Sequence, residues 1–315
     1  MKNYTTLADI EDLESLIREA RGLKSKNTES ELGKGKTLGM LFFNPSLRTR
    51  LSTEKAAKLL GMDVMVMNAD KDGWALEFED GAVMNSDKAE HIKEAAAVLS
   101  QYCDIIAVRA FPGLKDREKD ESEQVMNSFK KYASVPVVNL ESATGHPLQA
   151  LTDAITIQEI NKKERPKVVL TWAPHPKALP QSVPNSFTEM MQNLDVEFMI
   201  TNPRGYDLNA NIRKNVRVEH DQEQAFRDAD FVYVKNWSSY DEYGKVLDVE
   251  RDWTVDQEKL QQTDNAKVMH CLPVRRNMVI ADDVLDSESS IVIQQANNRT
   301  FAAQAVLKRI LECLK

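Results

Sequence analysis

Short apolar runs alternate with amphipathic stretches along the whole chain. In the first half, four runs have the length and composition of buried strands, and they span residues 37–43, 63–68, 104–109 and 136–140. The segments between them have the spacing of apolar positions that indicates helices, as in LRTRLSTEKAAKLLG after the first run and in residues 88–101 and 121–132. This alternation predicts a parallel sheet with helices on its faces.

The second half repeats the alternation after a predicted helix at residues 147–161. Further strand-like runs occupy residues 167–172, 196–201, 216–219, 231–235, 266–270 and 290–293, and a final amphipathic helix is expected over residues 298–315. The predicted fold is therefore α/β with two domains, each a parallel sheet flanked by helices. We expect the domains at residues 1–145 and 146–297, with the helix at 298–315 packing back on the first domain.

The composition excludes several classes of protein. A chain of 315 residues with 42% hydrophobic residues is long enough to bury two cores. Its net charge is −8, and basic and acidic residues are interspersed, so we expect neither a nucleic-acid partner nor a membrane surface. The N-terminus is polar and acidic and no segment has the length of a membrane span, which predicts a soluble cytoplasmic protein. The cysteines Cys103, Cys271 and Cys313 are few and far apart, which argues against disulfides and a zinc site.

Polar residues follow the predicted strands at the ends where ligands usually bind. Open α/β sheets bind ligands beyond the carboxyl ends of their strands. In this chain those positions hold segment 46–50 and the residues Arg109, Glu141, Lys235 and His270. We therefore expect these side chains to face one cleft between the two domains.

Three short motifs carry candidate chemistry. The first, SLRTR at residues 46–50, opens a helix, where backbone N–H groups, the helix dipole and a guanidinium favour a phosphate. A serine cap with solvated arginines is the alternative interpretation. The second motif, HPLQ, places His146 and Gln149 at the start of the helix at 147–161. The third, HCLP at residues 270–273, follows a buried strand, and Pro273 favours an extended Leu272 whose carbonyl oxygen could bind a ligand amine.

With these motifs in this order and spacing, the chain resembles the aspartate/ornithine carbamoyltransferase family over essentially its whole length. The resemblance implies that the first domain binds carbamoyl phosphate and the second binds an amino-acid acceptor, with no cofactor and no metal. Attack of the acceptor amine on the carbamoyl carbon builds negative charge on the carbonyl oxygen, so positioned hydrogen-bond donors are expected to dominate catalysis.

The resemblance also implies a set of contacts to carbamoyl phosphate. The phosphate would be bound by Ser46, Leu47, Arg48 and Thr49. The carbonyl oxygen would be contacted by the expected catalytic residues Thr49, Arg109 and His146. The carbamoyl amide would be held by Gln149 and by the carbonyl groups of Cys271 and Leu272, and Arg299 would reach the same site from the start of the last helix.

The residues expected around the acceptor favour an N-acylornithine. The stretch FVYVKNWSSY at residues 231–240 lacks the Ser-Met-Gly loop that handles the free α-amino group in ordinary ornithine carbamoyltransferases, and Lys235 would repel a cationic amine. Acylation makes this nitrogen a neutral amide and leaves the α-carboxylate to Lys235 and Arg275. The chain thus resembles the N-acylornithine branch of the family, in which Glu141 and His175 would contact the acylated substrate.

Two further segments, KDGWALEFE and TWAPHPKALPQSVPNSF, also resemble that branch. Trp74 in the first segment would reach the active site of a neighbouring subunit, which implies a homotrimer with shared sites. A core or interface aromatic residue is the alternative. In the second segment, the loop at 174–184 is the candidate for a knotted connection seen in this branch, although true knots are very rare.

Three positions bear on the acyl group. The acetyl-specific enzymes of the branch are expected to carry Glu at the position of Ala89 and a carboxylated lysine at that of Val279. A glutamate would repel and crowd the longer succinyl group, whereas Ala89 leaves room for it, although succinyl-type enzymes carry proline there. Lys177 is the candidate counter-ion for the distal carboxylate, with an ordinary solvated lysine as the alternative. We therefore expect N-succinylornithine as the acceptor, with N-acetylornithine as the alternative.

Two other functions fit parts of the pattern. A nicotinamide-dependent dehydrogenase also has two α/β halves, but no G-x-G-x-x-G segment follows a predicted strand in this sequence. A protein that binds carbamoyl phosphate without transferring it would not need the complete set of phosphate and carbonyl-oxygen ligands that the motifs supply.

Overall fold

The computed structural model describes residues 1–26, 30–249 and 252–314, and the chain divides into two compact units. Unit 1 comprises Met1–Gly113, Glu118–Leu148 and Arg299–Lys315, and unit 2 comprises Leu114–Arg117 and Gln149–Asn298. Each unit is built on a parallel sheet with helices on its faces, so the predicted two-part α/β fold is confirmed.

The sheet of unit 1 has the strand order β2-β1-β5-β6, and its pairs are parallel. Its strands are β1 (Thr37–Phe42), β2 (Asp63–Asn68), β5 (Ile105–Arg109) and β6 (Val137–Glu141). β5 and β6 are buried along their whole length, which explains why their apolar runs are nearly continuous. The register pairs Phe42 with Arg109 and Arg109 with Glu141, so the carboxyl ends of three strands meet at one edge.

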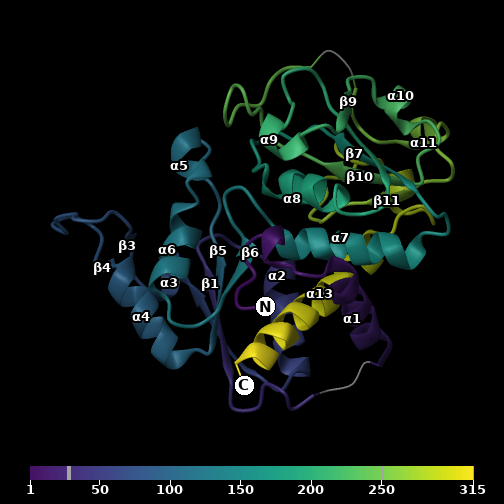
Figure 1. Ribbon diagram of the computed structural model, residues 1–315. Coiled ribbons are helices and arrows are strands. Elements are labelled where there is room, and N and C mark those ends of the chain that lie inside the picture. Colours follow the sequence, from purple (N-terminus) through teal and green to yellow (C-terminus); the bar gives the residue numbers. More distant parts are fainter. Residues whose placement is uncertain (27–29, 250–251, 315) are drawn as a thin grey trace. The chain divides into compact units, whose positions relative to one another are not determined.

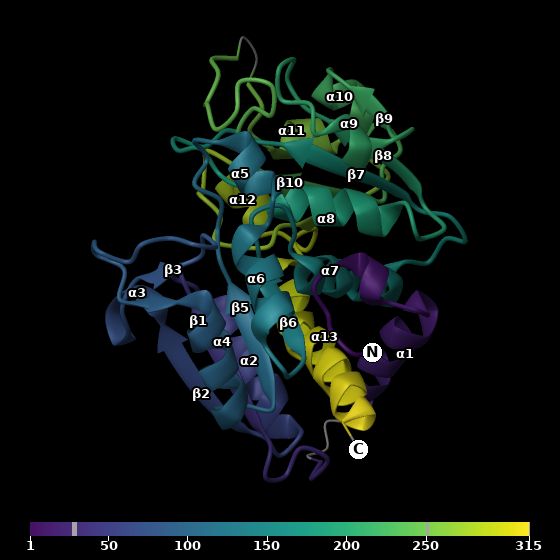
Figure 2. The same ribbon diagram turned by 60° about the vertical axis from the view of Figure 1, so that its left-hand side comes forward.

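Helices on both faces of this sheet complete unit 1 (Figures 1 and 2). α4 (Ile92–Tyr102) and α6 (Gln124–Tyr132) lie on one face, and α1 (Leu13–Lys26), α2 (Arg48–Leu59) and the C-terminal part of α13 (Val292–Cys313) lie on the other. The apolar stripes of α4 and α6 pack on the sheet in a core that includes Ile92, Val108 and Phe129. Each such side chain, fully buried, contributes about 1.5–3 kcal/mol to folding.

Several short elements connect the larger ones of unit 1. They are η1 (Leu7–Asp9), α3 (Ala69–Asp72), α5 (Arg117–Glu121) and a parallel ribbon of β3 (Leu76–Glu77) and β4 (Glu90–His91). Residues 88–101 are predicted as one helix, but their first part forms β4. α4 begins only at Ile92, because His91 is extended and its imidazole accepts the N–H of Lys93 as a cap.

The sheet of unit 2 has the order β11-β10-β7-β8-β9, and its pairs are also parallel. Its strands are β7 (Lys167–Trp172), β8 (Glu197–Thr201), β9 (Arg217–Glu219), β10 (Phe231–Lys235) and β11 (Lys267–Met269). α10 (Gln222–Phe226), α11 (Gln257–Leu260) and α12 (Asp282–Leu285) pack on one face in a core that includes Phe226, Val232 and Val268. α8 (Ser182–Met191) covers the opposite face, next to α9 (Ala210–Arg213) (Figure 1).

The long segment of unit 2 begins within α7 (Pro147–Ile160) and ends within α13. Pro147 occupies the first helical position, where its missing N–H costs no helical hydrogen bond. Within unit 2 the two helices are joined by polar side chains, since Asn298 Nδ2 donates to Thr156 Oγ1 over 3.0 Å and to Glu159 Oε2 over 2.9 Å. Among the residues that the structure describes, no helix is both long and apolar enough to cross a membrane.

Two predictions for the C-terminal region are wrong. Residues 290–293 are predicted as a strand and the last helix from residue 298, but α13 already begins at Val292, and Ser290 forms only an isolated bridge with Val268. Val292 is buried whereas Ile293 is 75% exposed, so the apolar run is the first turn of an amphipathic helix. A run this short does not distinguish a strand from a helical turn by periodicity.

Candidate active site

The first turn of α2 holds the residues predicted to bind phosphate. α2 begins at Arg48, and the residue in the capping position is Leu47, not Ser46, so the serine-cap alternative is wrong. Thr49 is buried, and its hydroxyl oxygen accepts a hydrogen bond of 2.6 Å from Nη2 of Arg299 in α13. The contact joins positions 250 residues apart and places a second guanidinium beside the positive end of a helix dipole, which favours an anion.

A buried ion pair lies where β5 and β6 end. Arg109 is the last residue of β5, Glu141 is the last residue of β6, and their side chains form a short ion pair through Nη1 and Oε2. His146 Nε2 lies 3.6 Å from the same Oε2. These three side chains are each no more than 9% exposed. The guanidinium of Arg109 also stacks over the ring of Phe111, 4.4 Å from its centroid, so its orientation is fixed on two sides.

Trp74 and Ala89 are brought together by the β3–β4 ribbon. Trp74 Nε1 donates to Glu90 Oε2 over 2.8 Å, and the N–H of Ala89 donates to the carbonyl oxygen of Ala75 over 3.2 Å. Trp74 is 59% exposed, so a core position for this aromatic residue is excluded.

The same ribbon is stabilised by one carboxylate. Glu77 accepts the backbone N–H groups of Glu79 and Phe78 and pairs with the ammonium group of Lys88. The backbone hydrogen bond from Glu79, followed by the hydrogen bond from Lys88, lowers the pKa of Glu77 to about 2. The segment between Trp74 and Ala89 is therefore held by a charge that persists at any physiological pH.

In unit 2, Gln149 belongs to a buried hydrogen-bond chain. Its Nε2 donates to Asp153 Oδ1 over 2.7 Å, and Gln295 Nε2 donates to the same oxygen over 2.7 Å. Gln295 Oε1 in turn accepts the backbone N–H of His270 over 2.9 Å. Because a carboxylate only accepts hydrogen bonds when ionised, both amides must turn their NH₂ groups toward Asp153. These hydrogen bonds connect Gln149 with the loop that follows β11.

Asp153 and Gln295 were not among the predicted site residues. Asp153 lies four residues after Gln149, on the same face of α7, and this spacing in the sequence was a usable signal. Gln295 gave no such signal, since its segment is predicted to lie before the last helix.

The loop after β11 is more tightly folded than predicted. Leu272 is predicted to be extended because it precedes Pro273, but its φ is +56°, in the left-handed region, and the Leu272–Pro273 peptide bond is cis. The N–H of Leu272 donates to His270 Nδ1 over 2.8 Å, and this bond closes the turn. A local side-chain acceptor has therefore overridden the ordinary preference of a residue before proline.

Three cations surround His175 in unit 2. Arg275 Nε donates to His175 Nε2 over 3.1 Å, and His175 Nδ1 lies 2.9 Å from the carbonyl oxygen of Lys177 and 3.1 Å from its backbone nitrogen. Burial lowers the pKa of His175, and the positive charges of Arg275, Lys235 and Lys177 lower it further. His175 is thus neutral at pH 7, while the groups around it make a site suited to carboxylates. Lys177 and Arg275 are exposed, and His175 and Lys235 are half-buried.

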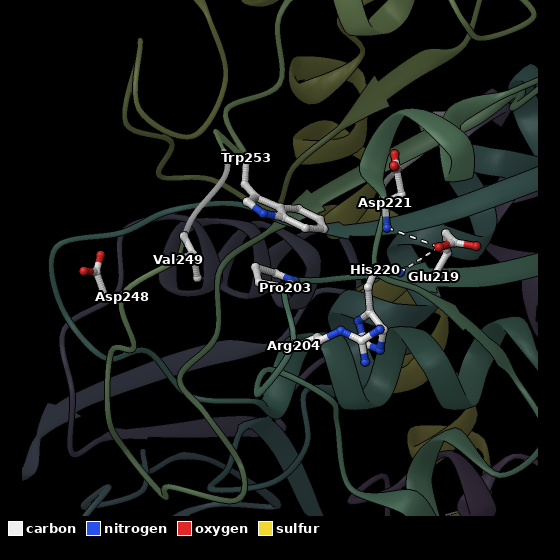
Figure 3. A pocket seen from close by; sticks show the side chains of 8 residues that line it. All are labelled: Pro203, Arg204, Glu219, His220, Asp221, Asp248, Val249 and Trp253. Atoms are coloured by element: carbon white, nitrogen blue, oxygen red, sulfur yellow. Dashed lines mark hydrogen bonds between the residues drawn. The ribbon is translucent and has the colours of Figure 1, made fainter.

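A separate cavity of about 570 Å³ lies at the carboxyl ends of β8 and β9 (Figure 3). It contains none of the predicted site residues, and its walls are formed by Pro203, Arg204, Glu219, His220, Asp221, Asp248, Val249 and Trp253. Figure 3 shows the carboxylate of Glu219 accepting the backbone N–H groups of His220 and Asp221, at 3.0 and 3.2 Å. Glu219 therefore stabilises the turn at His220 and Asp221. Within the described ranges, no group of three metal-ligating side chains is suited to hold a metal ion.

Comparison with known proteins agrees with this geometry. Residues 2–159 match the model of the carbamoyl-phosphate-binding domain of aspartate/ornithine carbamoyltransferases, and residues 180–310 match that of the Asp/Orn-binding domain. The chain is 52% identical to the N-succinylornithine carbamoyltransferase of Bacteroides thetaiotaomicron, with all of both chains covered. It is 38% identical to the N-acetylornithine carbamoyltransferase of Xanthomonas campestris pv. campestris, over 95% of this chain and 94% of that protein.

A solved structure gives the same result at the level of the fold. An N-acetyl-L-ornithine transcarbamylase variant with alanine in place of a glutamate, complexed with carbamyl phosphate and N-succinyl-L-norvaline, is 36% identical and has a TM-score of 0.91, covering 98% of this chain and all of that one. This chain belongs to the aspartate/ornithine carbamoyltransferase family.

Proposed function

We propose that the protein is an N-succinylornithine carbamoyltransferase. It transfers the carbamoyl group of carbamoyl phosphate to the side-chain amine of N-succinylornithine, and it gives N-succinylcitrulline and phosphate, a step of arginine biosynthesis. The full-length identity of 52% to a relative of that name supports the reaction. The observation that carries the choice of acceptor is the cluster of Arg275, Lys235 and Lys177 around His175, which is suited to carboxylates.

Carbamoyl phosphate is proposed to bind at the first turn of α2. The phosphate is bound by Ser46, Leu47, Arg48 and Thr49, and Arg299 supports the site through its hydrogen bond to Thr49. A dianion in this position benefits from the helix dipole and from charge-assisted hydrogen bonds to the guanidinium of Arg48.

The carbonyl oxygen of the carbamoyl group is proposed to accept hydrogen bonds from Thr49, Arg109 and His146. Arg109 and His146 are buried and share one carboxylate oxygen of Glu141, so they are fixed before the substrate arrives. Such fixed donors stabilise the charge that develops on the oxygen, at about 2.7–4 kcal/mol for one donor in the best-studied cases. We propose that Glu141 also accepts the acyl amide N–H of the second substrate.

The carbamoyl amide is proposed to be held by Gln149 and by the carbonyl groups of Cys271 and Leu272. Because Gln149 turns its NH₂ group toward Asp153, the amide oxygen is the atom that would accept a hydrogen bond from the carbamoyl NH₂ group. The hydrogen-bond chain through Gln295 to His270 connects this residue with the loop that carries the two carbonyl groups.

The chemical step requires an uncharged amine. The amine lone pair forms the new C–N bond to the carbamoyl carbon, the C–O bond to phosphate breaks, and its electron pair leaves with the phosphate. An alkyl ammonium has a pKa of about 10.4, so it must lose a proton before it attacks. The phosphate beside the amine is the proposed acceptor of that proton. After the C–N bond has formed, the nitrogen carries one proton too many, and we infer that it passes to the departing phosphate.

The acceptor is proposed to be held by its two carboxylates. Lys235 and Arg275 bind the α-carboxylate, and Lys177 binds the distal carboxylate of the succinyl group, which N-acetylornithine lacks. Ala89 is exposed and short, and leaves room for the longer acyl chain. Variants of the N-acetyl-L-ornithine transcarbamylase in which one glutamate is replaced by alanine or proline are complexed with N-succinyl-L-norvaline, which supports the idea that loss of a glutamate admits the succinyl group.

A direct assay tests this proposal. Purified protein is incubated with carbamoyl phosphate and either N-succinylornithine, N-acetylornithine or ornithine, and the ureido product is measured. We expect kcat/KM for N-succinylornithine to exceed that for N-acetylornithine at least about tenfold, which corresponds to one additional charge-assisted contact. A preference for N-acetylornithine would refute the choice of acceptor, and absence of product with all three would refute the activity.

We further propose that the protein is a homotrimer in which Trp74 completes the active site of a neighbouring subunit. Unit 1 exposes several large apolar side chains, which are Leu47, Leu51, Met65, Trp74, Val83 and Met84. In a trimer, side chains of this kind would be buried where they meet a neighbouring subunit. A Trp74→Ala protein and an Arg48→Ala protein should each be nearly inactive, but subunits exchanged between them should regain activity, because some mixed sites combine an intact Arg48 with an intact Trp74. If mixing restores no activity, the shared site is wrong.

A further inference from the structure

We propose that Glu123 is the positioning residue for His146, a role that rests on the proposed function of His146 at the carbamoyl oxygen. Glu123 is not part of any motif and lies 23 positions before His146 in the sequence. It precedes the first residue of α6, on a different element from His146 but within the same unit.

The side chain of Glu123 binds the turn that connects Glu141 with His146. Its Oε1 accepts hydrogen bonds from Ser142 Oγ at 2.7 Å, from the N–H of Thr144 at 2.7 Å and from Thr144 Oγ1 at 2.5 Å. Its Oε2 accepts the N–H of Ala143 at 3.3 Å. One carboxylate therefore contacts three consecutive residues of the turn. Ser142 is also held by its N–H and its hydroxyl at the carbonyl oxygen of Gly145 and by Asn139 Nδ2, which donates to Ser142 Oγ over 3.0 Å, whereas Ala143 and Thr144 donate their hydrogen bonds to Glu123.

The backbone of Glu123 is also unusual. Its φ is +50°, in the left-handed region that a non-glycine residue rarely adopts. Such a conformation persists where the surrounding contacts determine it. Here these are the four hydrogen bonds of the carboxylate and two backbone hydrogen bonds, from the N–H of Glu123 to Asp120 and from the N–H of Asn127 to Glu123.

A second contact fixes the chain on the other side of His146. The hydroxyl of Tyr4, which is fully buried, donates to the carbonyl oxygen of Pro147 over 3.1 Å. His146 thus lies between two anchored segments, the turn bound by Glu123 and the first residue of α7. A shift of the turn would move the imidazole relative to Glu141 and Arg109, and a displacement of about 1 Å from the reacting atoms is enough to lower a rate about 100-fold.

The carboxylate of Glu123 is expected to hold the turn through both of its acceptor oxygens. A glutamine in its place keeps one oxygen acceptor, but its NH₂ group cannot accept the N–H of Ala143. Glu123→Gln should therefore weaken the turn, while Glu123→Gly removes the carboxylate and at the same time tolerates the left-handed backbone. The glycine variant separates loss of the contact from backbone strain, and it is the variant expected to fold even if Glu123→Ala does not.

The experiment measures kcat and KM for carbamoyl phosphate in Glu123→Gln and Glu123→Gly, alone and combined with His146→Ala. We expect Glu123→Gly to lower kcat about 10- to 100-fold with KM changed less than about threefold, and Glu123→Gln to lower kcat by a smaller factor. In the His146→Ala background, Glu123→Gly should cause no further loss beyond about twofold, because the residue that it positions is already absent. A crystal structure of Glu123→Gly should show the imidazole displaced from its 3.6 Å approach to Glu141.

Glu219→Gln is the matched control. Glu219 also binds two backbone N–H groups of a turn, but that turn lies at the cavity of Figure 3 and contains no predicted site residue, so kcat should stay within about twofold of wild type. The inference is refuted if Glu123→Gly keeps wild-type kcat, or if it costs the same factor with and without His146. If wild-type protein transfers no carbamoyl group, the proposed function fails, and the position of His146 in the crystal structures still decides the inference.

Discussion

The polar residues proposed around the carbamoyl group differ sharply in burial from the cations proposed to bind the acceptor. Those for carbamoyl phosphate in unit 1 include Thr49, Arg109, His146 and Arg299, all at most 7% exposed and joined by side-chain contacts. Those for the acceptor in unit 2 lie on loops and strand ends, and Lys177 and Arg275 are exposed. The buried residues of unit 1 are fixed by the side chains around them, whereas the exposed residues of unit 2 are held by few contacts.

This difference follows from what each group must do. Stabilising the charge on a carbamoyl oxygen demands donors that do not reorganise during the reaction, and burial with paired charges provides that. Choosing an acyl group requires only that a few side chains at the edge attract one substrate or repel another. The contrast explains how relatives named for N-succinylornithine and N-acetylornithine can both be similar to this chain over nearly its whole length.

The largest loss of activity is expected from a substitution of Arg48, which is proposed to bind the phosphate in unit 1. Arg48→Ala removes charge-assisted hydrogen bonds to the phosphate, each worth about 1.5–3 kcal/mol, so kcat/KM for carbamoyl phosphate should fall roughly 1,000-fold. Steady-state kinetics with carbamoyl phosphate as the varied substrate measures this loss. Arg18→Ala, an exposed arginine on α1, is the control and should change nothing measurable. Near-normal efficiency of Arg48→Ala would remove the basis of the proposed function.

Glu141 tests whether burial really makes the unit 1 site rigid. Glu141→Ala leaves the guanidinium of Arg109 buried without its counter-charge, and breaking a buried pair in this way costs about 3–5 kcal/mol. We expect Tm to fall by at least about 5 °C in a thermal melt, together with a loss of activity. Glu141→Gln keeps an oxygen acceptor for Arg109 and should lose less. An unchanged Tm in Glu141→Ala would show that the pair contributes little to stability.

Lys177 tests whether an exposed residue of unit 2 selects the acyl group. Lys177→Ala should lower kcat/KM for N-succinylornithine about tenfold and that for N-acetylornithine less than about twofold, because only the first substrate carries a distal carboxylate. Lys162→Ala, a second exposed lysine of unit 2, should leave both values unchanged. Equal losses for both substrates would show that Lys177 does not recognise the distal carboxylate.

The smallest effect concerns the protonation of His175. Because its pKa is lowered in the folded protein, the unfolded chain takes up the proton first as the pH falls below about 6.5. The contribution of His175 to the free energy of unfolding is therefore fully present above that pH, and it is lost as the pH decreases toward the pKa of His175 in the folded protein. Between pH 7 and 5.5, a thermal melt should show a larger fall in Tm for wild type than for His175→Asn. Parallel pH curves for the two proteins would contradict the cation cluster.

Much of the fold was accessible from the sequence because its signals are local. β2, β7 and β10 have the predicted limits, β1, β5 and β8 differ by one residue at one end, and β6 is shifted by one residue at both ends. Buried parallel strands are this accessible because they give continuous apolar runs. The phosphate segment was also recognisable, because a strand, a turn and a helix in succession place its residues at a helix N-terminus whatever the rest of the chain does. Local signals were insufficient at two places. The short apolar run at 290–293 fits either a strand or a helical turn, and the proline after Leu272 did not fix the conformation of that residue.

The α/β class, the motifs and the type of chemistry follow from residue type and short-range spacing, which the sequence contains. The pairing of side chains depends on packing: Arg299 contacts Thr49, Glu141 pairs with Arg109, and Glu123 binds the turn before His146. Each of these contacts joins segments from different elements, and it exists because sheet register and helix packing bring the segments together. No local pattern encodes such a pairing, because the free energy that selects it is that of the whole packed unit.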